Sequence, residues 1–153
     1  MSAFANYSPQ ARDRAAEIFR GVTRFLAEHG ESSLSEFTLK TGRRVDLIAL
    51  DHQGIVTIIE IKSSLADYRS DKKWQEYRHF CDRFYFAVAI DFPTRKLPDT
   101  CGIIIADSFG ASVLRKPLDT KINAARRKAL TLNFARTSAA RLLTYTDPDW
   151  IRS

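Results

Sequence analysis

Two adjoining segments in the first half of the chain constrain its fold most. Residues 44–50 read RVDLIAL and residues 58–62 read IIEIK, so each is an apolar run interrupted by charge. Side chains alternate along a strand, which sends Glu60 and Lys62 to one face and Ile59 and Ile61 to the other. The turn sequence at 51–54 predicts that the two strands pair as a hairpin. Such pairing would bring both acids, Asp46 and Glu60, to one end of the hairpin.

The rest of the chain predicts helices around a mixed sheet. A proline at position 9 is tolerated in the first turn of a helix, and His29-Gly30 would end that helix. We further expect strands at 33–39, 43–50, 55–61, 83–90, 102–106 and 111–114, helices at 71–81 and 121–145, and loops at 63–70 and 91–100. This order favours an α/β class in which helices sandwich a mixed β-sheet. At 153 residues we expect one domain over 1–153.

Composition limits the possible classes of protein. No apolar stretch approaches the ~20 residues of a membrane span, and the first residues have no apolar signal core. The two cysteines, Cys81 and Cys101, are far apart and lack the spacing of metal ligands. We therefore expect a cytoplasmic protein with reduced thiols and no membrane partner. Its 24 Lys and Arg against 18 Asp and Glu give a net charge of +6, which suits a polyanion such as nucleic acid.

Asp46, Glu60 and Lys62 form a set typical of metal-assisted phosphodiester hydrolysis. That reaction needs charge neutralised on the phosphate and a water made nucleophilic, and Mg²⁺ can do both. Hard cations prefer oxygen ligands, here the two carboxylates and the backbone carbonyl of Ile61. Lys62 can orient the attacking water or stabilise charge in the transition state. The alternative is structural: Glu60 and Lys62 form a surface ion pair, and Asp46 merely lies near a turn.

Longer stretches of the chain resemble a known family. These are GRRVDLIALD, IIEIKSS, DKKWQEY, CDRFYFAV and RRKALTLNFAR, within residues 17–141. They are similar to the MmcB-like DNA repair proteins of bacteria, a group assigned to the PD-(D/E)xK nuclease superfamily. The resemblance implies a restriction-endonuclease-like fold, a Mg²⁺ cofactor for which Mn²⁺ can substitute, and a nucleic-acid substrate. It assigns Asp46 and Glu60 as metal-binding acids and Lys62 as the catalytic lysine; Val45 stands where the motif has proline.

Further acids are candidates near this set. Glu17, on the first helix, matches the additional metal-binding Glu of related Holliday-junction resolvases, although a solvated helix face explains it equally well. Glu36, on the strand before Asp46, belongs either near the site or in a cross-strand ion pair. Ser63 and Asp67 follow the lysine and are expected at the rim of the site.

Basic and polar residues complete the candidate list. On the predicted helix 71–81, Gln75 matches the position where members of the superfamily often place a polar residue that faces the site. Tyr77, on the same helix, is suited either to contact a phosphate or to pack in the core. Arg43 and Arg44 are candidates for phosphate contacts. The last helix carries a basic series that is either a solvated face or a surface that follows a nucleic-acid backbone: Lys121, Arg126, Arg127, Lys128, Arg136 and Arg141.

Together these observations predict a Mg²⁺-dependent DNA endonuclease, or a nuclease-like subunit, that acts in DNA repair. The expected partners are DNA, either of a particular structure or single-stranded, other repair proteins, and a second copy of the chain in a homodimer. Two alternatives stay open. One is a catalytically silent DNA-binding accessory protein. The other is an assembly protein that uses the aromatic residues Phe84, Tyr85 and Phe86 in an interface.

Overall fold

The computed structural model describes residues 8–150, which divide into two compact units at Ile122/Asn123. The first unit holds the whole sheet and the helices next to it. The second consists mainly of one helix, α4 (Ala124–Thr146). The Asn123 side chain caps this helix by accepting a hydrogen bond from the Arg126 backbone N–H at 2.8 Å.

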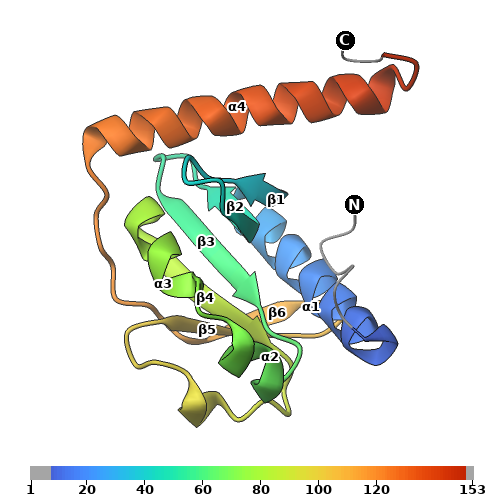
Figure 1. The fold of residues 1–153 in the computed structure, drawn as a ribbon, viewed down its shortest axis with the longest axis vertical. Coiled ribbons are helices and arrows are strands. Elements are labelled where there is room, and N and C mark those ends of the chain that lie inside the picture. The colour runs from blue at the N-terminus through green and yellow to red at the C-terminus, as the bar shows by residue number, and fades with distance from the viewer. Residues whose placement is uncertain (1–7, 151–153) are drawn as a thin grey trace. The chain divides into compact units, whose positions relative to one another are not determined.

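The first unit is built on a six-stranded mixed sheet whose strands follow one another in chain order (Figure 1). The strands are β1 (Ser32–Thr38), β2 (Arg44–Leu50), β3 (Val56–Ile61), β4 (Arg83–Val88), β5 (Gly102–Ala106) and β6 (Ala111–Arg115). The first three form an antiparallel meander, in which β2 and β3 pair as the turn sequence at 51–54 predicted. The next pairs, β3 with β4 and β4 with β5, are parallel, and β6 returns antiparallel. The predicted mixed α/β sheet with flanking helices is thereby confirmed.

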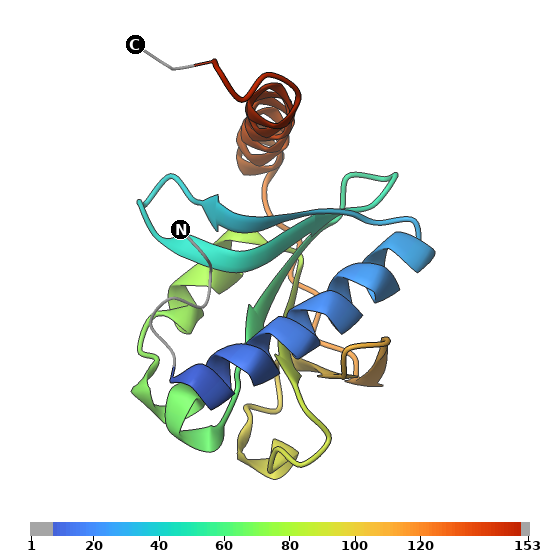
Figure 2. The same ribbon diagram turned by 90° about the vertical axis from the view of Figure 1, so that its right-hand side faces the viewer.

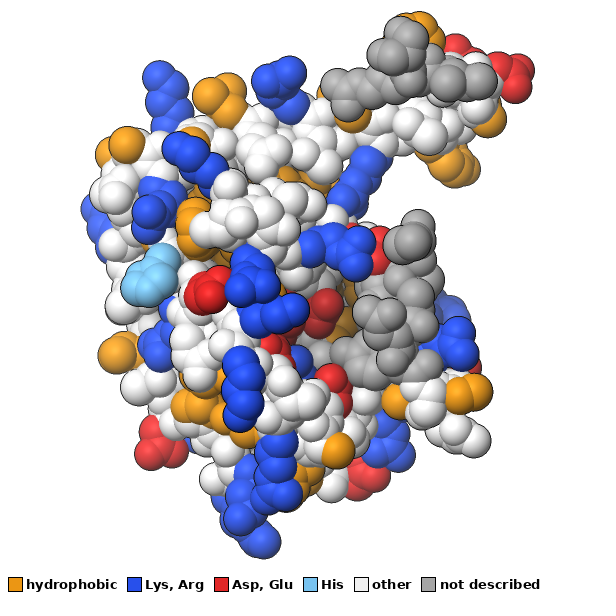
Figure 3. Space-filling view, in the orientation of Figure 1, with side chains coloured by type: hydrophobic (Ala, Val, Ile, Leu, Met, Phe, Trp, Pro, Cys, Tyr) orange, Lys and Arg blue, Asp and Glu red, His pale blue; other side chains and the backbone are white. Residues whose placement is uncertain are grey.

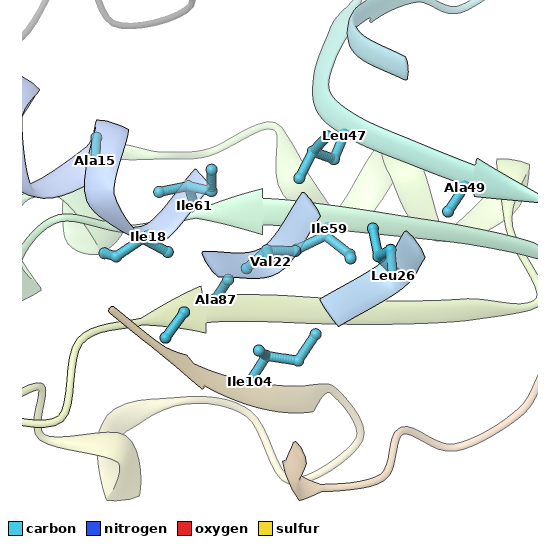
Figure 4. Packing of buried hydrophobic residues seen from close by; sticks show 11 residues of the cluster. Ala15, Ile18, Val22, Leu26, Leu47, Ala49, Ile59, Ile61, Ala87 and Ile104 are labelled. Atoms are coloured by element: carbon cyan, nitrogen blue, oxygen red, sulfur yellow. The ribbon is translucent and has the colours of Figure 1, made fainter. Parts of the chain in front are cut away.

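Helix α1 (Pro9–Glu28) covers one face of the sheet (Figure 2). Its apolar side chains recur at helical spacing and pack against alternate residues of the central strands. Figure 4 shows this cluster: Ala15, Ile18, Val22 and Leu26 from α1 with Leu47, Ala49, Ile59, Ile61, Ala87 and Ile104 from the sheet. Because side chains alternate along β2 and β3, this packing directs Asp46 and Glu60 to the opposite face.

The opposite face is covered by two short helices, α2 (Leu65–Ser70) and α3 (Trp74–Tyr77). The Trp74 ring lies 5.8 Å from that of Phe84 and 5.2 Å from that of Phe86, and Tyr68 meets Phe86 edge-on at 5.4 Å. Phe84 and Phe86 are 3% and 0% exposed. The internal core therefore accounts for these two aromatic residues of β4, and no interface is needed to explain them.

The prediction of a loop over 63–70 was wrong, because α2 occupies most of it. The Ser64 hydroxyl accepts a hydrogen bond from the Asp67 backbone N–H at 3.1 Å and so caps a helix of six residues. A helix of six mostly polar residues shows no recurring apolar side chains at helical spacing, so the sequence pattern did not predict it. The predicted helix over 71–81 is also shorter, since α3 continues only as a 3₁₀ turn, η1 (Arg78–Phe80).

Gly21 allows α1 to approach the turn between β5 and β6. A Cβ at this position would overlap the backbone oxygens of Asp107 and Gly110. We expect Gly21→Ala to lower the free energy of unfolding by about 2 kcal/mol or more, because overlap with backbone outweighs the better helix propensity of alanine. Denaturant unfolding measures this. Gly110→Ala is the matched control, since its Cβ would meet nothing within 4 Å. Wild-type stability of Gly21→Ala would contradict the close approach.

Candidate active site

Asp46 and Glu60 interrupt the hydrogen-bond ladder between β2 and β3. The regular pairs run from Leu50↔Val56 to Leu47↔Ile59, so Asp46 and Glu60 come next in register. Here side chains take over the bonding: the Ile61 N–H donates to Asp46 Oδ2 at 2.8 Å, and the Asp46 N–H donates to Glu60 Oε1 at 2.9 Å. Each carboxylate is thus held by the backbone of the other strand. The structure brings the two predicted acids together at one end of the hairpin.

The surroundings of these acids disfavour their negative charge. Glu60 is 5% exposed and Asp46 is partly buried. Burial raises the pKa of Asp46 to about 6, although the hydrogen bond from Ile61 and the charge of Lys62 act in the other direction. Burial, reinforced by the charge of Asp46, raises the pKa of Glu60 well above its usual range. A pair of carboxylates in this state gains from a cation bound between them.

Lys62 follows β3 directly and pairs with Asp71 instead of Glu60. Its backbone N–H continues the ladder to the Ala87 carbonyl at 3.0 Å. Its Nζ donates to Asp71 Oδ2 at 2.7 Å, and the two side chains are only 6% and 12% exposed. Burial would lower the pKa of Lys62, but the bond to Asp71 and the charge of Glu60 outweigh it, so the pKa is raised. Lys62 is therefore an ammonium donor close to the acids.

The ion pair between Asp71 and Lys62 was not predicted from the sequence. Asp71 Oδ1 also accepts a hydrogen bond from the Lys73 N–H at 2.8 Å, just before α3. The bond to Lys62 spans nine residues and depends on the path of α2. Nothing in the local sequence signals that contact.

Ser63 and Asp67 lie together at the start of α2. Asp67 Oδ2 accepts from the Ser63 N–H at 3.0 Å and from its hydroxyl at 3.3 Å. The charge of Asp67 contributes to the raised pKa of both Asp46 and Lys62, which places it near the acids. Asp67 therefore fixes the segment that follows Lys62.

Tyr77 and Arg43 flank the acids on the α3 side. Tyr77 is buried, and its pKa is raised by that burial and then by the charges of Glu60, Asp71 and Asp46, so its ring lies beside them. The Arg43 Nε donates to Glu76 Oε2 at 3.0 Å and joins the start of β2 to α3. On the face seen in Figure 3, acidic side chains gather near the middle with Lys and Arg around them.

Gln75 and Arg44 are exposed, on α3 and at the start of β2 respectively. Arg44 faces Thr38 in the register of β1 and β2.

The two further candidate acids, Glu17 and Glu36, lie on α1 and β1 respectively. Glu17 lines a hollow at the ends of β4 and β5, together with Arg14 and Asp91. Glu36 lies between Ser35 and Phe37, which pair with Leu47 and Val45 of β2. Its φ of 48° is a left-handed conformation that non-glycine residues rarely adopt. Within residues 8–150 no group of three or more His, Cys, Asp or Glu side chains is placed to hold a metal ion.

Comparisons with known proteins agree with this fold. A family model described as DNA repair protein MmcB-like matches residues 4–149. A solved structure of a protein of unknown function from Silicibacter pomeroyi is similar with a TM-score of 0.87 and 40% identity, covering 91% of this chain and 95% of that one. No curated protein matches. In the part of the chain that the structure describes, no helix is long and apolar enough to cross a membrane.

Proposed function

The chain belongs to the MmcB-like family of DNA repair proteins, and from this membership we propose that it is a metal-dependent DNA endonuclease of the PD-(D/E)xK type. One observation carries the proposal: the reciprocal backbone bonds that hold Asp46 and Glu60 together, with the Lys62 ammonium beside them. The fold, a mixed sheet whose hairpin presents these residues, supports a restriction-endonuclease-like architecture.

The donor set suits Mg²⁺, with Mn²⁺ as a substitute. Asp46 and Glu60 offer hard carboxylate oxygens, and the carbonyl of Ile61 lies between Glu60 and Lys62 in the chain. The raised pKa values of both acids mean that their charges are poorly compensated within the protein. A bound divalent cation would supply that compensation.

In the proposed reaction the chain's own residues orient the groups that react. When bound, Mg²⁺ would neutralise phosphate charge and lower the pKa of a water. Lys62 donates hydrogen bonds to the attacking water or to a phosphate oxygen, where negative charge builds up in the transition state. Tyr77 excludes bulk water from the buried side, and Arg43 and Arg44 contact neighbouring phosphates without reading sequence. The backbone bonds to Asp46 and Glu60 keep both acids in fixed positions.

A cleavage assay tests this function. We expect branched, nicked, single-stranded or duplex DNA to be cut in Mg²⁺ or Mn²⁺ but not in a chelator. Asp46→Asn should remove cutting, because the amide still accepts the Ile61 N–H but no longer supplies a charged ligand. Glu76→Gln, on the exposed face of α3, is the matched control. Cutting by Asp46→Asn at the wild-type rate would refute the assignment.

A catalytically silent DNA-binding accessory protein is the second candidate. It is favoured by α4, which has five basic residues and no acid. Such a surface supports binding to a phosphate backbone whether or not cleavage occurs. Salt-sensitive binding of DNA, with no cutting of any substrate in either metal, would identify this function instead.

A further inference from the structure

We propose that Asp71 is a positioning residue that holds the Lys62 ammonium beside Asp46 and Glu60. The inference rests on the proposed nuclease function, because it assigns a part in that reaction to a residue outside the superfamily motif. The contact that carries it is the 2.7 Å ion pair between Lys62 Nζ and Asp71 Oδ2.

Asp71 is itself fixed from several sides. One carboxylate oxygen accepts from Lys62 Nζ and the other from the Lys73 N–H. Its backbone N–H donates to the Tyr68 carbonyl at 3.2 Å, at the end of α2. The next helix begins at Trp74, whose ring is packed on Phe84 and Phe86. Asp71 is thus attached to the core on both sides and cannot follow a moving lysine.

Lys62 needs such a support because its side chain is long and flexible. A lysine carries a compact charge on a four-carbon stem with considerable rotamer freedom. Without Asp71, the ammonium would be drawn to the Glu60 carboxylate, whose charge already acts on it, and there it would compete with a metal ion. Because the pair is mostly buried, solvent weakens it little. Asp71 therefore keeps the ammonium available as a donor and the acids available as ligands.

The opposite role for Asp71 would be inhibition, in which it withdraws Lys62 from the reaction. The two roles predict opposite changes when the carboxylate is neutralised. Positioning predicts slower cleavage, because an unsupported donor loses its geometry in the transition state. Inhibition predicts faster cleavage.

The test compares Asp71→Asn with the wild-type protein on a DNA that the latter cuts. We expect kcat to fall about 10- to 100-fold, with KM little changed because binding of the ground state does not depend on Lys62. Asp71→Glu, which keeps the charge, should recover part of kcat. An unchanged or higher kcat in Asp71→Asn would overturn the proposal.

Asp82→Asn is the matched control for loss of a buried carboxylate. Asp82 accepts from the Val56 N–H at 2.8 Å and from the Ile122 N–H at 3.1 Å, at the other end of β3. It should lower the melting temperature without lowering kcat, at a temperature where the variant is folded. If Asp82→Asn lost as much kcat as Asp71→Asn, destabilisation would explain the loss in both variants, and the proposal would be overturned.

A second measurement does not need cleavage. The rate of Lys62 acylation by an amine-reactive reagent at fixed pH is followed by peptide mass spectrometry. We expect several-fold faster labelling in Asp71→Asn than in the wild type or Asp82→Asn, and equal rates would overturn the assignment. If the wild type cuts no substrate but the variant labels faster, the nuclease function fails while Asp71 remains the residue that positions Lys62.

Discussion

Lys62→Ala is expected to reduce kcat for DNA cleavage by about 100- to 1000-fold, because it removes a charged donor that acts on the transition state. The metal-binding acids and the basic surface remain, so DNA affinity should change little. Single-turnover cleavage and a binding titration on the same DNA measure the two quantities. Retained affinity with lost cleavage is the expected result, and cleavage at the wild-type rate would contradict the role of Lys62.

Two companion variants separate chemistry from stability. Lys62→Ala leaves Asp71 buried without its cation, which we expect to lower the free energy of unfolding by about 3 kcal/mol. Lys62→Ala/Asp71→Asn removes both charges and should recover most of that stability while staying inactive. Lys62→Arg keeps the charge but not the compact ammonium, so its cleavage should also be slow. Recovery of cleavage in the double variant would show that the single variant failed only through destabilisation.

The meeting of Asp46 and Glu60 could be predicted from the sequence because strand register is set by the hydrophobic pattern. Leu47 and Ile59 are paired and both face α1. Because side chains alternate, the neighbouring acids Asp46 and Glu60 both lie on the opposite face. The antiparallel pairing of β2 with β3 follows from the same alternation and from the turn sequence at 51–54.

Contacts made across α2 could not be predicted in the same way. The ion pair of Lys62 with Asp71 depends on a six-residue helix whose only signals are Ser64 and Asp67. The position of Glu17 depends on how α1 crosses the sheet, and that crossing follows from packing against strands distant in sequence. Helical spacing alone does not specify which end of a helix lies near a given strand.

Glu60→Gln is expected to make the metal-free protein more stable at pH 7. The folded-state pKa values of Asp46 and Glu60 are raised, first by burial, so the folded protein binds more protons than the unfolded chain between the usual carboxyl pKa and the raised one. Wild-type stability therefore falls as pH rises from about 4 through about 6. Glutamine removes this charge while its oxygen still accepts the Asp46 N–H. We expect a higher free energy of unfolding than that of the wild type at pH 7, and a difference that shrinks toward pH 4.

The free energy of unfolding, measured first in a chelator and then in Mg²⁺ or Mn²⁺, tests whether Glu60 lowers stability but is needed to bind metal. Metal should stabilise the wild type, because a ligand that binds only the folded state adds to its stability, and it should stabilise Glu60→Gln far less. Glu76→Gln is the matched control: Glu76 is exposed and pairs with Arg43, so added metal should stabilise this variant as much as it stabilises the wild type. A Glu60→Gln protein less stable than wild type at pH 7 without metal would show that the acids are not held in an unfavourable charged state. We expect Glu60→Gln to be more stable than the wild type without metal, and this advantage to disappear when metal is added. That result would mean that the fold keeps two poorly compensated carboxylates because a bound cation requires them.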